Sequence, residues 1–144
     1  MKTIAAILLF TLTCFSQSAR VATVTRTVQL FGDLERKLEA ADSSGKAQML
    51  TDDFEERLCA APGTPVPRGT CLQESATRNV QFSQEAVHSY GEIAIYSALR
   101  TQDQTDNMIV DTWQQADGGW KLSVRYRCPA TGDKPAKSAL PKRY

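Results

Sequence analysis

The sequence predicts an α+β domain in which N-terminal helices pack on a curved, mainly antiparallel sheet. Three observations predict it: apolar residues near the N-terminus follow helical spacing, apolar and polar residues alternate after residue 79, and an Asp-Gly pair at 117–118 joins two strand-like segments. Helices followed by a run of strands typically pack as two layers around one core. We expect this curved sheet, closed by helices, to leave a cavity at its wide end.

The first predicted elements are two helices. Apolar residues recur every three or four positions across residues 24–41, which predicts an amphipathic helix whose charged residues, Glu35 and Glu39 among them, face mostly outward. The segment DSSG at 42–45 ends this helix and can cap a second, short one that runs to about Leu50. The apolar residues of the first helix are Val24, Val28, Phe31, Leu34, Leu38 and Ala41.

Strands are expected to follow the helices. Residues 53–60 are typical of a short strand, the proline- and glycine-rich loop APGTPVPRG follows it, and a helical turn is expected around residues 70–75. Residues 80–82 and 86–90 are expected to form one bent strand or two short ones. Gly91-Glu92 is a tight turn, and the alternating segment Ile93–Arg100 is the next strand.

The last hairpin has the most specific pattern. Asp-Gly favours a two-residue turn because glycine tolerates a positive φ. With Asp117-Gly118 at the tip, Trp113 faces Leu122 and Asp111 faces Val124, so Asp111 is a lone carboxylate on the core face. A bulge would shift this register and turn Asp111 outward. The predicted core face holds Ile109, Asp111, Trp113, Trp120, Leu122, Val124 and Tyr126. The opposite, mostly solvated face includes Arg125 and Arg127, which could also bind an anion or a partner subunit.

Length and net charge indicate a single-domain protein that does not bind nucleic acid. The chain of 144 residues is long enough for one domain, and its net charge of +1 with scattered basic residues does not indicate nucleic-acid binding. Residues 1–19 are predicted to be a signal peptide cleaved between residues 16 and 22, with a retained membrane anchor as the alternative. We therefore expect a bacterial periplasmic or secreted protein without a stable membrane span. Residues 129–144 are expected to form a disordered, basic tail.

Three cysteines remain after such a cleavage: Cys59, Cys71 and Cys128. In an oxidising compartment the simplest pairing is Cys59–Cys71, which would pin the proline-rich loop. Cys128 would then be buried, pair between subunits, or displace one partner of that bridge. Their spacing is not that of a zinc site, and His88 is the only histidine, so no metal is expected.

Several short motifs resemble a known family. They are LTDDF at 50–54, GEIA at 91–94, VDTW at 110–113 and DGGWKL at 117–122. With the order of elements, they make residues 23–128 similar to the nuclear transport factor 2-like superfamily, which includes SnoaL-like cyclases and ketosteroid isomerases, and most similar to a SnoaL-like branch of unassigned function. The resemblance implies a cone-shaped fold and a homodimer formed through the sheet, but fold alone does not supply a function.

The candidate site centres on Asp111. A carboxylate in an apolar pocket has a raised pKa and suits a general acid or base, with His88 or Tyr126 assisting. The alternative is a structural carboxylate that accepts hydrogen bonds. The residues expected to contact a ligand are Trp113, Tyr90, Asp53 and Trp120.

Three functions remain open. The chain has no nucleophile elbow, phosphate-binding loop, dinucleotide fingerprint or metal motif, so no cofactor is expected. The first hypothesis is an exported protein that binds a small, largely apolar molecule. The second is a cofactor-free isomerase, cyclase or hydratase with Asp111 as its acid or base. The third is a non-catalytic module for dimerisation or envelope assembly.

Overall fold

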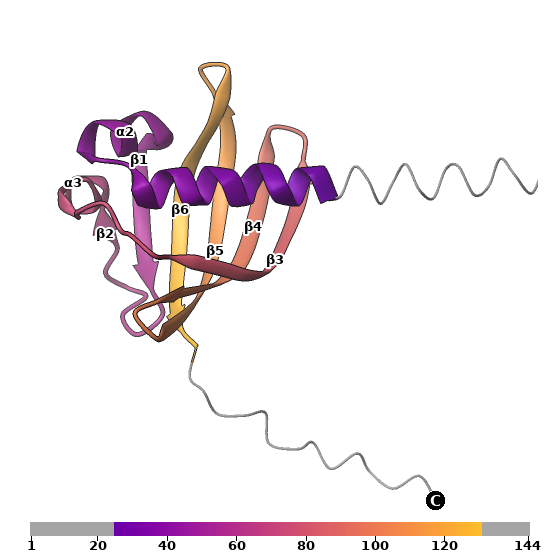
Figure 1. Cartoon of the computed structure of the whole chain (residues 1–144). Helices are drawn as coiled ribbons and strands as arrows, with labels where there is room; N and C mark the ends of the chain where they lie inside the picture. Colours follow the sequence, from indigo (N-terminus) through magenta and orange to yellow (C-terminus); the bar gives the residue numbers. More distant parts are fainter. Residues whose placement is uncertain (1–24, 131–144) are drawn as a thin grey trace, which may run out of the picture.

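A computed structural model describes residues 25–130 of the chain. A long helix, residues 25–40, crosses one face of a six-stranded sheet whose strand order is β2-β1-β6-β5-β4-β3 (Figure 1). The predicted α+β class is confirmed. The predicted signal peptide and most of the predicted tail lie outside the described residues. Within residues 25–130, none of the helices has the length and apolar character needed to cross a membrane.

The remaining elements follow the long helix in this order: α2 (Ser43–Met49), β1 (Leu50–Leu58), β2 (Val66–Pro67), α3 (Arg68–Gln73), β3 (Gln81–Tyr90), β4 (Ile93–Gln102), β5 (Thr105–Ala116) and β6 (Gly119–Pro129). Strands β3 to β6 form an antiparallel meander. Strand β1 pairs with β6 in parallel, so β1 and β2 extend the sheet beyond the last strand of the meander.

Local sequence explains where the elements begin and turn. Asp42 caps α2, its carboxylate accepting a hydrogen bond of 2.8 Å from the Gly45 backbone N–H. At the tip of the last hairpin, Asp117 and Gly118 have φ angles of 53° and 76°. Two successive positive φ angles are what a tight hairpin turn of strongly twisted strands requires, so the predicted turn is confirmed.

The hairpin register departs from the prediction beyond Leu122. Trp113 faces Leu122 as expected, but a bulge then adds one residue, Ser123, to β6. Asp111 therefore faces Arg125 instead of Val124. A bulge reverses the alternation only on the strand that contains it, so Asp111 stays on the inner face and Arg125 turns inward to meet it. The same shift pairs Ile109 with Arg127 and leaves Tyr126 on the outer face, 43% exposed.

The core lies between the long helix and the sheet. Phe31 of the helix packs on the indoles of Trp113 and Trp120, with ring centroids 6.2 and 5.0 Å apart. The expectation that Glu35 and Glu39 face outward is wrong, because both are buried on the same side of the helix as Phe31. The largest buried side chains of this layer are Trp113, Tyr96, Phe31, Ile109, Leu122, Glu35 and Asp111.

The predicted bridge between Cys59 and Cys71 is wrong. The structure joins Cys59 to Cys128, with Cα atoms 4.9 Å apart, and leaves Cys71 as a buried free thiol on α3. Cys59 directly follows β1 and Cys128 lies near the end of β6, so the bridge fastens the two parallel strands at the same end of the sheet. Sequence distance favours the nearest pair, whereas strand pairing brings the distant one together.

Candidate functional site

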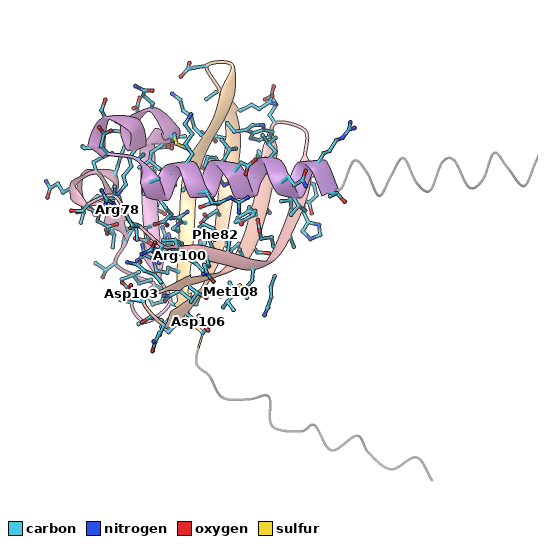
Figure 2. All side chains as sticks on the ribbon, viewed as in Figure 1. Arg78, Phe82, Arg100, Asp103, Asp106 and Met108 are labelled. Carbon is cyan, nitrogen blue, oxygen red and sulfur yellow. A yellow bond between two sulfur atoms is a disulfide. The ribbon has the colours of Figure 1, made fainter. Side chains whose placement is uncertain are left out.

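A cluster of buried ionisable groups fills the space between the long helix and the sheet. Glu35 and Glu39 come from the helix, and three partners come from separate strands: Arg100 of β4, Asp111 of β5 and Arg125 of β6. Arg100 is labelled in Figure 2, below the long helix in that view, and it donates to Glu39 of the helix. Charged groups this deeply buried are tolerated only when they are paired and hydrogen-bonded.

Arg125 is the centre of the cluster. Its Nε and Nη2 atoms donate to Asp111 Oδ1 and Oδ2 at 3.0 and 2.6 Å. Nη2 also donates to Glu35, and Nη1 donates to Glu39 over 3.4 Å. Asp111 has no solvent exposure, and both of its carboxylate oxygens accept from this one guanidinium. Its environment is therefore charged, in contrast to the apolar surroundings that the predicted register gave it.

Arg100 pairs with the second helix carboxylate. Its Nε and Nη2 atoms donate to the two oxygens of Glu39 at 2.9 and 2.8 Å, and Nη2 also donates to Gln102. Burial alone would raise the pKa of Glu39. The hydrogen bonds from Arg100 and the positive charges of Arg125 and Arg100 outweigh it, so the pKa of Glu39 is lowered and the group is ionised.

Glu35 behaves in the opposite way. Complete burial, followed by the negative charge of neighbouring Asp111, raises the pKa of Glu35 well above its ordinary value, although Arg125 opposes this. Trp113 Nε1 donates to Glu35 Oε1 at 3.0 Å. The cluster contains three carboxyl groups and two guanidiniums, so one proton on Glu35 makes its net charge zero. We interpret Glu35 as the group that carries this proton.

A cavity of about 250 Å³ adjoins the cluster, between the long helix, α2, α3 and the β1–β6 half of the sheet. Its floor is apolar and includes Leu50, Phe54 and Leu122, while the remaining wall is strongly charged. The charged groups are Lys46, Arg100, Arg125 and Arg127 on the positive side and Glu39, Glu56 and Glu74 on the negative side. The cavity is therefore suited to a polar ligand with an apolar part.

Two groups in the cavity wall have unused hydrogen-bonding atoms. Arg127 Nη2 lies 2.6 Å from Glu56 Oε1 as an ion pair, but this contact lacks hydrogen-bond geometry. Glu56 Oε1 and Arg127 Nε are buried and have no hydrogen-bond partner in the described part of the chain. Burial raises the pKa of Glu56, and the charges of Arg127 and Arg125 limit the rise. Unpaired buried polar atoms are uncommon and call for an explanation.

Cys71 also lines the cavity. Burial, followed by the negative charge of Glu56, raises the pKa of its thiol to about 11. The thiol is therefore protonated at neutral pH and is a poor nucleophile. Within residues 25–130, no group of three or more histidine, cysteine, aspartate or glutamate side chains is placed to hold a metal ion.

The residues expected to act together in catalysis lie apart. Asp111 is fully buried, accepts hydrogen bonds from Arg125 and does not line the cavity. His88 and Tyr126 are both exposed, and their register on β3 and β6 places them on the outer face of the sheet. The structure does not bring either of them to Asp111.

The residues expected to contact a ligand also lie outside the cavity wall. Trp113 and Trp120 pack in the core against Phe31. Tyr90 is 65% exposed at the end of β3, and Asp53 is an exposed residue of β1. The cavity wall therefore consists of residues outside the predicted site, and of these only Arg125 and Arg127 were considered from the sequence for binding an anion.

Part of the missed site has a signal in the sequence. Glu35 and Glu39 lie four and eight positions after Phe31, which is the spacing of one helix face, so they share the phase of the core residues. Arg100 continues the alternation of buried residues Ala94, Tyr96 and Ala98 in the same way. The bulge at Ser123 hides Arg125 and Arg127, because nothing in the local pattern places it there.

Comparison with known proteins identifies the fold. No family model matches the chain, and no curated protein matches it in sequence. Among solved structures, an NTF2-like (nuclear transport factor 2-like) protein from Cytophaga hutchinsonii is 19% identical, with a TM-score of 0.61 over 70% of this chain and 96% of that one. The fold is NTF2-like. The finer resemblance to the SnoaL-like branch stays a prediction.

Other structures with this fold have different descriptions. A protein of unknown function from the DUF3225 family of Pectobacterium atrosepticum is 16% identical, with a TM-score of 0.57 over 74% of this chain and 89% of that one. The CaMKII hub of S. rosetta is 18% identical, with a TM-score of 0.56 over 74% of this chain and 96% of that one. At these identities the NTF2-like likeness describes architecture, and function has to be argued from the site.

Proposed function

We propose that this protein binds a small molecule bearing an anionic group in the cavity between the long helix, α3 and strands β1 and β6. The observation that carries the proposal is the lining: Lys46, Arg100, Arg125 and Arg127 converge on one cavity with an apolar floor. Guanidinium groups suit carboxylate and phosphate oxygens because their N–H groups form a planar fork. This replaces the largely apolar ligand of our sequence-based hypothesis.

The energetic cost of the charges supports a role in binding. Well-packed apolar side chains in the place of a buried ion pair are often as stabilising or more so. Glu56 and Arg127 form an ion pair in the cavity wall that leaves one buried atom of each without a hydrogen bond, so the chain gains little stability from them. The cavity of about 250 Å³ lies just below the usual size of drug-binding pockets, roughly 300–1,000 Å³, and suits a small metabolite.

The enzymatic hypothesis has less support. Both oxygens of Asp111 already accept from Arg125, and the carboxylate does not reach the cavity. A general acid or base has to lie within hydrogen-bond reach of its substrate. The acid–base role of Asp111 therefore stays a prediction that the geometry does not favour.

We propose as a second function that two copies associate through the outer face of the sheet. Exposed Ile93, Ile95, Met108 and Tyr126 lie on this face, on strands β4, β5 and β6. The residues paired across these three strands at its centre, such as Ile95, Thr112 and Val124, are uncharged. An uncharged apolar patch meets its own copy without like-charge repulsion, as a twofold contact requires. One structure with a similar fold is described as a CaMKII hub, and this description is consistent with association between copies.

Export is a further part of the proposal. The bridge between Cys59 and Cys128 is compatible with an oxidising compartment such as the periplasm or the extracellular space. The predicted signal peptide would deliver the chain there. Mass spectrometry of the protein from its own host tests this by measuring the mature N-terminus, which should fall between residues 16 and 22.

Thermal unfolding with a panel of small anions tests the binding proposal. Acetate, 4-methylpentanoate, phosphate and their uncharged analogues are the probes. A ligand that binds only the folded state raises the melting temperature, and the rise grows with the logarithm of the ratio of ligand concentration to Kd. At least one anion should stabilise the protein while its neutral analogue does not, and the Arg127→Met variant should lose the response.

The matched control is Arg57→Met. Arg57 lies one position from Glu56, but it pairs with Glu55 and does not line the cavity. This variant should respond like the natural protein. If no anion shifts the melting temperature, or if both variants lose the response equally, the anion-binding proposal is wrong.

A further inference from the structure

The cavity and the buried cluster have a wall in common. Arg125 and Glu39 line the cavity and also pair with each other within the cluster. Glu35 and Asp111 lie behind this wall, have no solvent exposure and do not line the cavity. Arg125 connects Glu35 to the cavity, because its Nη2 atom donates to the Glu35 carboxyl group. A change of charge on Glu35 therefore acts on the cavity through a poorly hydrated interior, where charges are weakly screened.

Glu35 meets ionisable groups from each element packed around it. They are Glu39 on its own helix, Tyr96 on β4, Asp111 on β5 and Arg125 on β6. Glu35 and Asp111 are also joined by a side-chain hydrogen bond. An ionised carboxylate can only accept hydrogen bonds, so this contact requires a proton on one of the two groups. The arrangement of the cluster therefore includes one proton.

The net charge around the cavity depends on this proton. Four cationic and three anionic side chains line the cavity, and Asp111 behind the wall adds one negative charge. These charges balance while Glu35 is protonated. Ionisation of Glu35 leaves one excess negative charge, and a bound anion adds a second. Because like charges in a buried region repel strongly, an anion should bind less tightly once Glu35 is ionised.

We infer that the anion site is regulated by pH through Glu35, which has to carry a proton for an anion to bind tightly. The inference rests on the proposed anion binding and adds its regulation. Coupling between two sites is reciprocal, so an anion that binds the ionised form favours uptake of a proton from the buffer onto Glu35. Burial and the charge of Asp111 raise the pKa of Glu35, so the protonated form persists above the usual range of a carboxyl group. Affinity should be constant below this raised pKa and fall about tenfold as pH rises through it.

Glu56 is the alternative carrier of the proton. It lines the cavity, and burial raises its pKa. Its Oε1 atom lies 2.6 Å from Arg127 Nη2, however, and this cation favours the ionised form of Glu56. Glu35 instead shares the guanidinium of Arg125 with two further carboxyl groups. This competition for one cation makes Glu35 the group that gains most from a proton.

Calorimetric titration of the full chain with 4-methylpentanoate tests the inference. This probe stays ionised between about pH 6 and 9, so any uptake of protons belongs to the protein. Titrations at one pH in two buffers that differ in their enthalpy of ionisation give the number of protons taken up. The affinity of the natural protein should fall about tenfold with rising pH, with an uptake of about half a proton per bound anion at the middle of the fall.

Three variants identify the group that takes up the proton. Glu35→Gln stays neutral, so it should take up no protons and keep, at every pH, an affinity within about threefold of that of the natural protein at about pH 6. Glu56→Gln should still take up protons. Glu55→Gln is the matched control and should behave like the natural protein, because Glu55 pairs with Arg57 and does not line the cavity.

The indole N–H of Trp113 gives a reading that does not depend on a variant. It donates to Glu35 Oε1 at 3.0 Å, so its NMR resonance should titrate with Glu35, and at a higher pH when 4-methylpentanoate is bound.

The outcomes separate this inference from the proposal on which it rests. Binding without proton uptake, uptake that persists in Glu35→Gln, or uptake that Glu56→Gln abolishes overturns the inference but keeps the anion-binding proposal. A titration of Trp113 that the ligand does not shift has the same meaning. If 4-methylpentanoate does not bind at any pH, the inference is wrong. If acetate and phosphate also fail to bind, the anion-binding proposal is wrong as well.

Discussion

The two faces of the sheet differ in an unusual way. The buried inner face carries charged side chains, and the exposed outer face carries apolar ones. The inner face, under the long helix, holds buried Asp111, Arg100 and Arg125. The outer face, open in the single chain, holds exposed Ile95 and Tyr126. Charge inside and apolar surface outside both carry a free-energy cost for an isolated chain. The comparison indicates that neither face is explained by the stability of the monomer alone.

The inner charges are compensated over long sequence distances. Arg125 meets Glu35 across 90 positions of the chain, and Arg100 meets Glu39 across 61. Each pair ties the long helix to a different strand. The outer apolar residues have no such partners within the described chain. The inner charges are therefore paired within the described chain, apart from single buried atoms such as Glu56 Oε1 and Arg127 Nε, whereas the apolar residues of the outer face are exposed.

The largest loss of stability is expected when the guanidinium of Arg125, at the centre of the inner cluster, is removed. Arg125→Met should lower the free energy of unfolding by about 3–5 kcal/mol, because it leaves the buried carboxylates around Asp111 without their main cation. Urea denaturation measures the change. Arg57→Met, which removes a partly exposed ion pair with Glu55, should cost less than about 1 kcal/mol. Equal losses would mean that the buried cluster contributes no more than the surface pair.

Removal of the disulfide between Cys59 and Cys128 should have the next largest effect on the free energy of unfolding. Cys128→Ser opens a bridge between positions 69 residues apart, a loop worth about 4 kcal/mol in the chain-entropy model. Cys71→Ser should leave the bridge in place and cost much less. Non-reducing electrophoresis with urea denaturation of both variants distinguishes the two pairings. Loss of the bridge in Cys71→Ser would restore the pairing that the sequence first suggested.

Glu35 should make the free energy of unfolding depend on pH. Its folded-state pKa is raised, mainly by burial, so the folded state binds the proton more tightly than the unfolded state does. This contribution is fully present below the unfolded pKa, near 4.5, and is lost as pH rises toward the folded pKa. Glu35→Gln, which stays neutral, should flatten the fall in unfolding free energy above that pH. An unchanged pH profile would show that Glu35 does not carry the proton.

The smallest effect on monomer stability is expected on the outer face. Tyr126→Lys should change the free energy of monomer unfolding by less than about 0.5 kcal/mol, since the side chain is 43% exposed. If two copies meet there, the buried lysine pair should shift the population to monomers, as measured by light scattering. Gln73→Lys, at an exposed position of α3 on the helix side of the sheet, is the control and should leave the oligomeric state unchanged. A natural protein that is monomeric at high concentration would contradict the proposed association.

Prediction from the sequence was most successful where the signal is local. The Asp117-Gly118 turn and the Asp42 cap were predictable, because each depends on the φ preferences or side-chain reach of a few neighbouring residues. Glu35 was predictable in principle from its phase relative to Phe31. It was missed because a charged residue is rarely placed on the buried face of a helix.

The sequence by itself determined the order of the elements, the tight hairpin tip and the inward direction of Asp111. Only the tertiary structure decided that Arg125 meets Asp111, that Cys59 bonds to Cys128, and that Arg127 and Glu56 share one cavity. The physical reason is that one extra residue at Ser123 reverses the facing of every later side chain on β6, and that the parallel pairing of β1 with β6 joins segments far apart in the chain. Neither the bulge nor the parallel pairing is indicated by the residues next to it in the sequence.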